Sequence, residues 1–356
     1  MWKVLNEWYQ KYLSDPQAVI LAFLLIAGFT IVITMGNMLM PALAALVIAY
    51  LLEGIVKFLE KHGAKRMRAV FIVFFAFIAF LFFIFFGVAP LISNQLGQFI
   101  KDLPEYIGKA QLALLQLPEH VSFITEQQVS DASIAIEKEI ASFGQTVLKV
   151  SLTSIPGIIT IAIYLILVPV MVFFFLKDKD LLLAWAGSFL PQNKELAGSV
   201  WREVDQQIGE YIRGKFWEII IVGGVTFIVF AIMGLKYSLL LGALVGLSVL
   251  IPYIGAAVIT IPVAAVAYSQ WGWTTEFGYL LLAHGIIQGI DGNVLVPKLF
   301  SEVVNLHPIA IILSILVFGG LWGFWGVFFA IPLATLVSAL LHAWPRTLPE
   351  SADSNV

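Results

Sequence analysis

Cysteine is absent from this 356-residue sequence, and charged residues make up only 12% of it. Without cysteine there is no disulfide bond, no thiolate catalysis and no cysteine-ligated metal or iron–sulfur centre. The sequence also has no HExxH, GxSxG or Walker A motif, which excludes the common metal-hydrolase, nucleophile and P-loop chemistries. We therefore expect a protein that is not an enzyme and that has no metal site and no cofactor.

Apolar residues are what the chain has in abundance. Hydrophobic residues make up 60% of the sequence, and a soluble domain is typically about 25% charged. A globule this apolar would expose more hydrocarbon surface than water tolerates. The composition therefore predicts an all-α, polytopic helical integral membrane protein. The formal net charge of −3 adds little, because the few charges are segregated by loop.

About eight helical segments are expected to be embedded in the membrane. Crossing about 30 Å of hydrocarbon takes roughly 20 apolar residues. Six apolar runs have about this length, and two more are longer and are broken in the middle. The six are 18–35, 38–58, 69–92, 152–176, 216–235 and 277–296, and the broken runs are 239–269 and 309–342.

Basic residues predict the orientation. Five of them lie in or next to the loop between the second and third segments, namely Lys57, Lys61, Lys65, Arg66 and Arg68. This places the loop and both termini in the cytoplasm. We interpret the insert that follows the third segment as a solvated cap, with a substrate gate or partner surface as the functional alternative. The predicted parts are membrane helices 1–3 in 1–92, an extracytoplasmic helical insert in 93–150, membrane helix 4 in 151–176, a cytoplasmic amphipathic linker in 177–215, a membrane transport core in 216–345 and a disordered cytoplasmic tail in 346–356.

The two broken runs resemble each other. Both open with Leu-Ser-X-Leu and close with Ile-Pro-X-Ala. Each run crosses once, which gives eight spans, or each is a re-entrant hairpin, which gives six spans and two hairpins. Run length favours hairpins, because a single span of over 30 residues would need strong tilt. Hairpins also place Lys298 on the cytoplasmic side, and labelling of cysteines placed at Lys298 and Thr274 distinguishes the two topologies.

Asp291 is the strongest candidate for a functional side chain, because it lies between apolar runs. A carboxylate inside a membrane points to a proton relay, a cation ligand or a solute contact. The alternative is a local cap, in which Asp291 and Asn293 turn the chain around Gly292. His284 and Gln288 lie about two turns and one turn earlier, where they share a polar stripe with Asp291 or form a buried hydrogen-bonded pair.

The breaks themselves are the second set of candidates. Unwound backbone at paired Gly/Pro breaks offers free N–H and C=O groups to a solute, whereas packing of helices through small residues is the structural alternative. His307 either titrates and gates a proton or caps the last run. The predicted tips comprise Pro252, Tyr253 and Gly255 in the first run and Gly319, Gly320, Gly323 and Gly326 in the second.

Charges before the fifth segment are assigned to the interface. Arg213 and Lys215 are expected to anchor the chain there by extending their side chains to water, and gating is the functional alternative. Glu218 lies about one turn into the segment, close enough in sequence to form a local ion pair with one of them.

Four motifs carry a resemblance to a known family. They are YIRGK at 211–215, YSLLLGALVGLSVLIPYIGA at 237–256, DGNVLVPKLFSEVVNLHP at 291–308 and FGGLWGFWGVFFAIPLA at 318–334. The chain resembles the AI-2E (autoinducer-2 exporter) transporter family, and in particular its PerM-type permeases, over nearly its whole length and most weakly in 93–150. The resemblance implies a polytopic protein of the bacterial inner membrane. Some members are linked to export of autoinducer-2 and others to Na⁺/H⁺ exchange.

The expected function is a secondary transporter or permease, an exporter of a small hydrophilic solute or signal molecule, coupled to H⁺ or Na⁺. A cation/proton antiporter, a passive channel and a structural membrane protein are the alternatives. The expected partners are the lipid bilayer and a small-molecule or ion substrate, with no nucleic acid. Flat apolar faces would permit a homo-oligomer.

Overall fold

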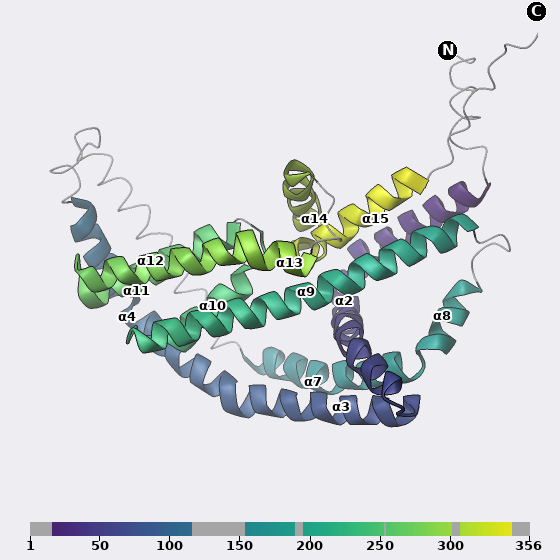
Figure 1. Cartoon of the computed structure of the whole chain (residues 1–356), viewed down its shortest axis with the longest axis horizontal. Helices are drawn as coiled ribbons and strands as arrows, with labels where there is room; N and C mark the ends of the chain where they lie inside the picture. The colour runs from purple at the N-terminus through teal and green to yellow at the C-terminus, as the bar shows by residue number, and fades with distance from the viewer. Residues whose placement is uncertain (1–15, 116–153, 189–194, 253, 301–306, 344–356) are drawn as a thin grey trace, which may run out of the picture. The chain divides into compact units, whose positions relative to one another are not determined.

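The computed structural model describes residues 16–115, 154–188, 195–252, 254–300 and 307–343. These residues form helices and turns and contain no strand, which confirms the predicted all-α class (Figure 1). Six of the described helices are long and apolar enough to cross a membrane. Most of the predicted insert, the C-terminal tail and Tyr253 lie outside the described residues.

The described chain is a succession of helices. In chain order they are α2 (Pro16–Lys61), α3 (Arg66–Phe82), η1 (Phe83–Val88), α4 (Ala89–Leu115), α7 (Ser154–Lys177), α8 (Lys179–Gly187), α9 (Glu195–Ile232), α10 (Ser238–Ser248), α11 (Ile254–Trp271), α12 (Thr275–Ile290), η2 (Asp291–Leu295), α13 (Val296–Phe300), α14 (Pro308–Phe328) and α15 (Ala330–Ala343). The elements η1 and η2 are π-helical turns within longer helices.

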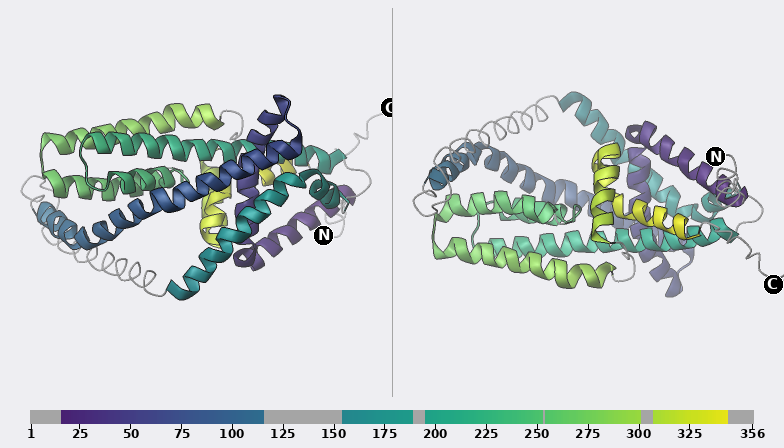
Figure 2. Two further views of the ribbon diagram at one scale, coloured as in Figure 1. Left: turned by 90° about the horizontal axis from the view of Figure 1, so that it is seen from below. Right: turned by 90° about the horizontal axis from the view of Figure 1, so that it is seen from above.

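The first two predicted spans form one helix, α2. Its 46 residues correspond to about 70 Å of helix, more than twice the thickness of the hydrocarbon layer. Pro41 lies inside α2 and removes one backbone N–H, and Figure 2 shows α2 changing direction along its length. The apolar runs 18–35 and 38–58 are recognised from their composition. Composition alone does not reveal that the backbone between the two runs stays helical.

The second part of the predicted linker, from Glu195, and most of the fifth span form one helix, α9, of 38 residues. The first part of the linker contains a separate helix, α8. Nothing between 195 and 232 breaks the backbone, because this range contains no proline and its glycines are tolerated inside a helix. Residues 195–215 are more polar than residues 216–232, but this change in composition does not end the helix. From Glu195 onward, the amphipathic linker that we expected is therefore continuous with the fifth span.

The described chain divides into two compact units by its contacts. Unit 1 contains residues 1–70, 168–213 and 302–356, and unit 2 contains residues 71–167 and 214–301. The two broken runs fall in different units, the first in unit 2 and the second in unit 1. The grouping of 216–345 as one transport core therefore stays a prediction.

Polar contacts hold unit 1 together. Arg66 at the start of α3 donates to the carbonyl of Leu176 near the end of α7, over 2.8 Å. Lys179 of α8 lies 3.0 Å from Glu53 of α2. Tyr50 of α2 donates to Asp205 of α9 over 2.5 Å. These side chains join elements that are more than 100 residues apart in the sequence.

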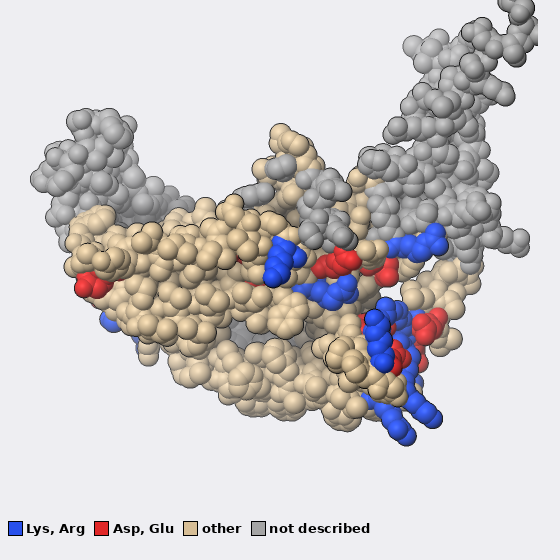
Figure 3. Space-filling view, viewed as in Figure 1, with Lys and Arg blue, Asp and Glu red and all other residues tan. Residues whose placement is uncertain are grey.

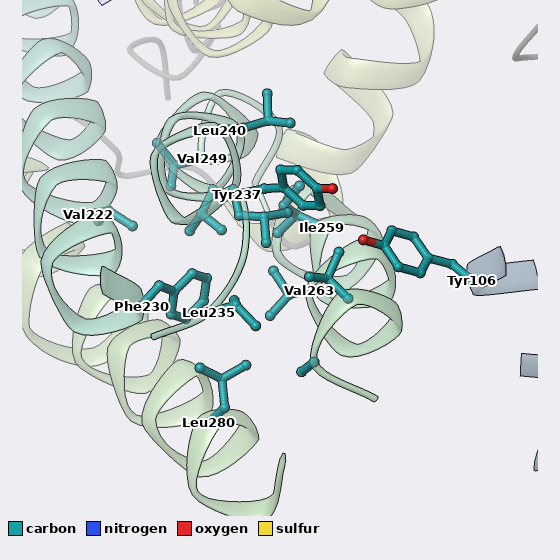
Figure 4. Close-up of a cluster of buried hydrophobic side chains, with 14 residues drawn as sticks. Tyr106, Val222, Phe230, Leu235, Tyr237, Leu240, Val249, Ile259, Val263 and Leu280 are labelled. Atoms are coloured by element: carbon teal, nitrogen blue, oxygen red, sulfur yellow. The ribbon is translucent and has the colours of Figure 1, made fainter. Parts of the chain in front are cut away.

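Unit 2 has an apolar core to which five helices contribute. Figure 4 shows Phe230 of α9, Leu240 of α10, Val263 of α11, Leu280 of α12 and Tyr106 of α4 directed into this core. The helix α4, which begins the predicted insert, packs on α10 and α11. The first part of the insert therefore belongs to a packed unit.

The helices α9 and α10 approach each other closely through glycine. A Cβ atom placed on Gly246 would lie 2.7 Å from the carbonyl oxygen of Ile219 and 2.9 Å from the Cα of Gly223. A Cβ atom on Gly242 would lie 2.8 Å from the Cα of Phe227. Small residues permit this backbone-to-backbone contact. It brings the end of α10 beside the turn of α9 that contains Glu218 and Ile219.

The first broken run is a helical hairpin. Gln270, near the end of α11, accepts a hydrogen bond from the backbone N–H of Lys236 at 2.9 Å and donates to the carbonyl of Gly234 at 2.8 Å. Both partners lie just before α10, so α11 returns to the level at which α10 begins. The 11 residues of α10 span about 16 Å, about half of the hydrocarbon thickness.

The hairpin predicts a cross-link. Cysteines at Lys236 and Gln270 are expected to be joined by a short bismaleimide, since the two positions are in contact and no native cysteine interferes. The control pair, Lys236→Cys with Ile254→Cys at the other end of α11, should stay unlinked. If 236–270 were one straight helix, its ends would lie about 50 Å apart. Mass spectrometry that finds no Lys236–Gln270 link in the double-cysteine protein would contradict the hairpin.

Large apolar side chains remain exposed along the helices. On α3 and η1 they include Phe75, Phe82, Phe83 and Phe86. Figure 3 shows Lys and Arg gathered where α2 meets α3, beside a wide surface of α3 without charged residues. Exposed phenylalanine is unfavourable in water but compatible with lipid chains. The surface therefore agrees with the membrane-length helices.

Candidate functional site

Two charged residues of α9 are buried inside unit 2. Lys215 is 5% exposed and Glu218 is 2% exposed. Residues three apart in a helix lie on the same face, and the Nζ of Lys215 is 2.8 Å from the Oε2 of Glu218. The ion pair predicted for Glu218 is thus present, with Lys215 as its partner. Burial of Lys215 shows that the expected interfacial anchor is wrong for this residue.

Lys215 also binds the broken end of α10. Its Nζ donates to the carbonyl of Val249 at 2.8 Å and lies 5.2 Å from the centre of the Phe300 ring. Val249 is the C-cap of α10, and the last carbonyls of a helix have no donor within the helix. A cation at this end also interacts favourably with the helix dipole. Lys215 therefore gives a hydrogen-bond donor to the carbonyl of Val249, which the end of α10 would otherwise leave without a partner.

Asp291 is the third member of what we call the charged cluster: Lys215, Glu218 and Asp291. It is 8% exposed and lies at the start of the π turn η2. Asp291 interacts electrostatically with Lys215 and with Glu218. Among the described residues its Oδ1 atom has no hydrogen-bond partner although it is buried. Turns of π-helix occur frequently at functional sites.

The charged cluster is not neutral when both carboxylates are ionised. Two negative charges and one positive charge leave a sum of −1. An uncompensated charge inside a protein costs several kcal/mol. Glu218 compounds this cost, because its Oε2 faces Lys215 but lacks a well-aligned hydrogen-bond donor in the described part of the chain. The arrangement is therefore suited to taking up one proton or one cation.

The chain does not turn at Asp291, which argues against the alternative of a local cap around Gly292. The helices α12, η2 and α13 follow without interruption from Thr275 to Phe300. Asn293 is exposed, and its side chain donates to the carbonyl of Gly289 on the preceding turn at 2.8 Å. Asn293 therefore has a bond within its own helix, whereas Asp291 faces the interior.

His284 and Gln288 precede Asp291 on the same helix. His284 is buried, and its Nε2 lies 3.1 Å from the hydroxyl of Thr260 on α11. It also lies beside the Phe230 ring, 6.0 Å between ring centres. The hydrogen bond of His284 is thus made to Thr260, a residue that the sequence pattern did not single out, and it joins α11 to α12. Gln288 is half-buried, and its Nε2 has no partner among the residues that the structure describes.

The tip of the first break is tightly packed. A Cβ atom on Gly255 would overlap the carbonyl oxygen of Ser248, the last residue of α10. Pro252 is half-buried in the connection and has no N–H to continue a helix. Close approach of the backbone explains why residue 255 is glycine. The end of α10 explains why the carbonyl of Val249 is available to Lys215.

The second break folds the chain back sharply in unit 1. Gly323 has φ of 60° and ψ of −137°, a conformation outside the helix and favoured by glycine. A Cβ atom on Gly326 would overlap the carbonyl of Phe318, and one on Gly319 would lie 2.8 Å from Val327. Gly320 has open space around it. Figure 2 shows α14 and α15 running in different directions from this break.

His307 and Arg213 lie apart from the charged cluster. His307 is exposed at the N-cap of α14, where its Nδ1 accepts a hydrogen bond from the N–H of Ile309 at 3.3 Å. This is the capping role. Arg213 is exposed, and its side chain extends beside Gly209 and Gly54 in unit 1. Sequence reasoning thus assigned both Arg213 and Lys215 to the interface, whereas the structure buries Lys215 and leaves Arg213 exposed.

Metal binding has no obvious site in the ranges that the structure covers. No group of three or more His, Asp or Glu side chains within those ranges is arranged to hold a metal ion.

The chain is similar to known membrane proteins along nearly its whole length. The profile described as AI-2E family transporter matches residues 19–346. The "Putative permease PerM" of Escherichia coli (strain K12) is 49% identical over 346 residues, which cover 97% of this chain and 98% of the relative. The "Putative transport protein YueF" of Bacillus subtilis (strain 168) is 29% identical over 315 residues, covering 86% and 84%. With its membrane-length helices, this chain is a multi-pass membrane protein that belongs to the AI-2E transporter family.

Proposed function

We propose that this chain is a secondary transporter of the bacterial inner membrane. Its cargo is a small hydrophilic solute or signal molecule, which it exports in exchange for H⁺ or Na⁺. The observation that carries the proposal is the charged cluster beside a broken helix. Charged groups inside membrane-length helices are costly and mark ion or substrate pathways, and broken helices at the same place supply backbone ligands.

The relatives support transport without naming a cargo. The Escherichia coli relative is called a permease, and the Bacillus subtilis relative is called a transport protein. Neither name describes an enzyme. The loop at 57–68, in which Lys57, Lys61, Lys65 and Arg68 are exposed, supports cytoplasmic termini.

A cation/proton antiporter is the second candidate. The sum of −1 in the charged cluster favours it, because a single site that binds either H⁺ or a cation is enough for exchange. A passive channel and a structural membrane protein do not need buried Asp291. The lipid bilayer and a small solute or ion are the proposed partners, and a homo-oligomer is compatible with the exposed apolar helices.

Flux through reconstituted protein tests the proposal. Purified protein in liposomes is expected to give saturable uptake of a polar solute or of Na⁺ that rises at least fivefold when a pH or Na⁺ gradient is imposed. A pH-sensitive dye inside the liposomes should report H⁺ movement in the same experiment. Unsaturable flux that ignores both gradients would indicate a channel. Absence of flux for every solute, with a stable protein complex, would indicate a structural role.

A further inference from the structure

We infer that Lys215 is a tethered competitor for a monovalent metal cation, which binds between Glu218, Asp291 and the carbonyl end of α10. This inference rests on the proposed transport function and specifies its coupling ion as Na⁺ or an ion of similar size and charge. The lysine ammonium already binds the carbonyl of Val249 and Glu218, so the cation shares these oxygens with it and the two positive charges repel each other.

The ligand atoms are oxygens of the kind that hard cations prefer. Val249 offers a carbonyl at the end of a helix, which already binds the Lys215 ammonium at 2.8 Å. Asp291 offers Oδ1, which is buried and has no hydrogen-bond partner among the described residues. Glu218 offers Oε2, 2.8 Å from the same ammonium. C-terminal ends of broken helices coordinate Na⁺ in other transporters.

Charge selects the class of cation. The charged cluster sums to −1 with Lys215 in place, so one monovalent cation makes it neutral and a divalent cation leaves it at +1. An ammonium and a metal cation on the same oxygens repel each other, and each weakens the binding of the other. The lysine therefore sets the affinity of the site and holds the backbone of Val249 when the cation leaves.

An ion pair with a purely structural role would need only Lys215 and Glu218, without Asp291. Lys215 and Glu218 already compensate each other, and Val249 already has its hydrogen bond. Asp291 adds a further buried carboxylate that this pair leaves uncompensated, although its helix could have kept an apolar residue there. A third charge with an unpartnered oxygen points to a ligand that is not part of the chain.

Binding of radioactive Na⁺ to the purified full-length protein tests the inference. Choline chloride keeps the ionic strength constant. Wild type is expected to bind one Na⁺ per chain, and Lys215→Met is expected to bind it at least tenfold more tightly because the competing charge is gone. Asp291→Asn should weaken binding at least tenfold. The matched control is Lys179→Met, which removes a lysine paired with Glu53 at 3.0 Å in unit 1, and it should leave the affinity unchanged.

Equal Na⁺ affinity in wild type and Lys215→Met would overturn the inference. So would Na⁺ binding that survives Asp291→Asn, or a wild-type protein that binds protons but neither Na⁺ nor K⁺. If Lys215→Met does not fold, the double variant Lys215→Met/Glu218→Gln keeps a single buried carboxylate and no lysine. Sodium chloride should then raise its melting temperature above that in choline chloride, and equal melting temperatures would overturn the inference.

The cation site and the transport function can be rejected independently of each other. Solute flux without any bound or competing cation would leave the proposed transporter standing and reject the cation site. Cation binding with the expected response to Lys215→Met, but no flux of any solute, would keep the site and reject the transporter.

Discussion

Replacing Asp291 by asparagine is expected to abolish gradient-driven flux while the protein stays folded. Asparagine has nearly the same size but cannot ionise, so the charged cluster becomes neutral with Lys215 and Glu218 paired. Gradient-dependent uptake into liposomes should fall at least tenfold. The melting temperature should stay the same or rise, because removing an uncompensated buried charge is stabilising.

The control for this variant is Asp180→Asn on α8, where the carboxylate is exposed. The same chemical change at the surface should alter the flux by less than a factor of two. Full gradient-driven flux in the Asp291→Asn protein would remove Asp291 from the mechanism. A fall in flux accompanied by a fall in melting temperature would instead assign Asp291 a structural role.

Gly255→Ala is expected to destabilise unit 2 strongly. The added methyl group would overlap the backbone carbonyl of Ser248, which cannot rotate away as a side chain can. Overpacking costs typically 1–3 kcal/mol, and we expect about 3 kcal/mol here because backbone must move. A shift of Ser248 also displaces Val249, its neighbour in the chain and the acceptor for Lys215. Both the unfolding midpoint in denaturant and the transport rate should therefore fall.

Two glycines of α12 provide matched controls. Gly285 and Gly289 have open space around the position of a Cβ atom, and alanine in a helix is more stable than glycine by about 0.5–1 kcal/mol. Alanine at either position should leave the unfolding midpoint unchanged or raise it. If Gly255→Ala unfolds at the same denaturant concentration as these controls, the tight packing at the first break is wrong.

Hydrophobicity was enough to predict the membrane helices, because apolar length is a local property. It could not predict that α2 and α9 are continuous, since a polar stretch such as 195–215 can remain helical in a different environment. Asp291 stood out because a carboxylate among apolar residues is visible in the sequence. Lys215 did not, because Arg213, Gly214 and Lys215 lie where the composition changes and resemble an interfacial anchor.

Burial of Lys215 depends on contacts that are distant in sequence. A Cβ atom on Gly214 would lie 2.6 Å from the Phe300 ring, so only glycine lets this ring pack close beside Lys215. The acceptor Val249 becomes available because α10 ends 34 residues later. The one local signal was the spacing of Lys215 and Glu218, three apart on a helix. That spacing predicts an ion pair but says nothing about burial.

The glycine contacts between α9 and α10 fix the height of α10 along α9. Gly242 and Gly246 lie one turn apart, and at both positions the backbone of α10 meets α9 with no side chain of α10 between them. Two contacts on one face oppose both tilting and sliding of α10 against α9. Val249 lies three residues beyond Gly246, about 4.5 Å along the axis. The carbonyl that Lys215 binds is therefore positioned by glycines that touch neither the lysine nor the carboxylates.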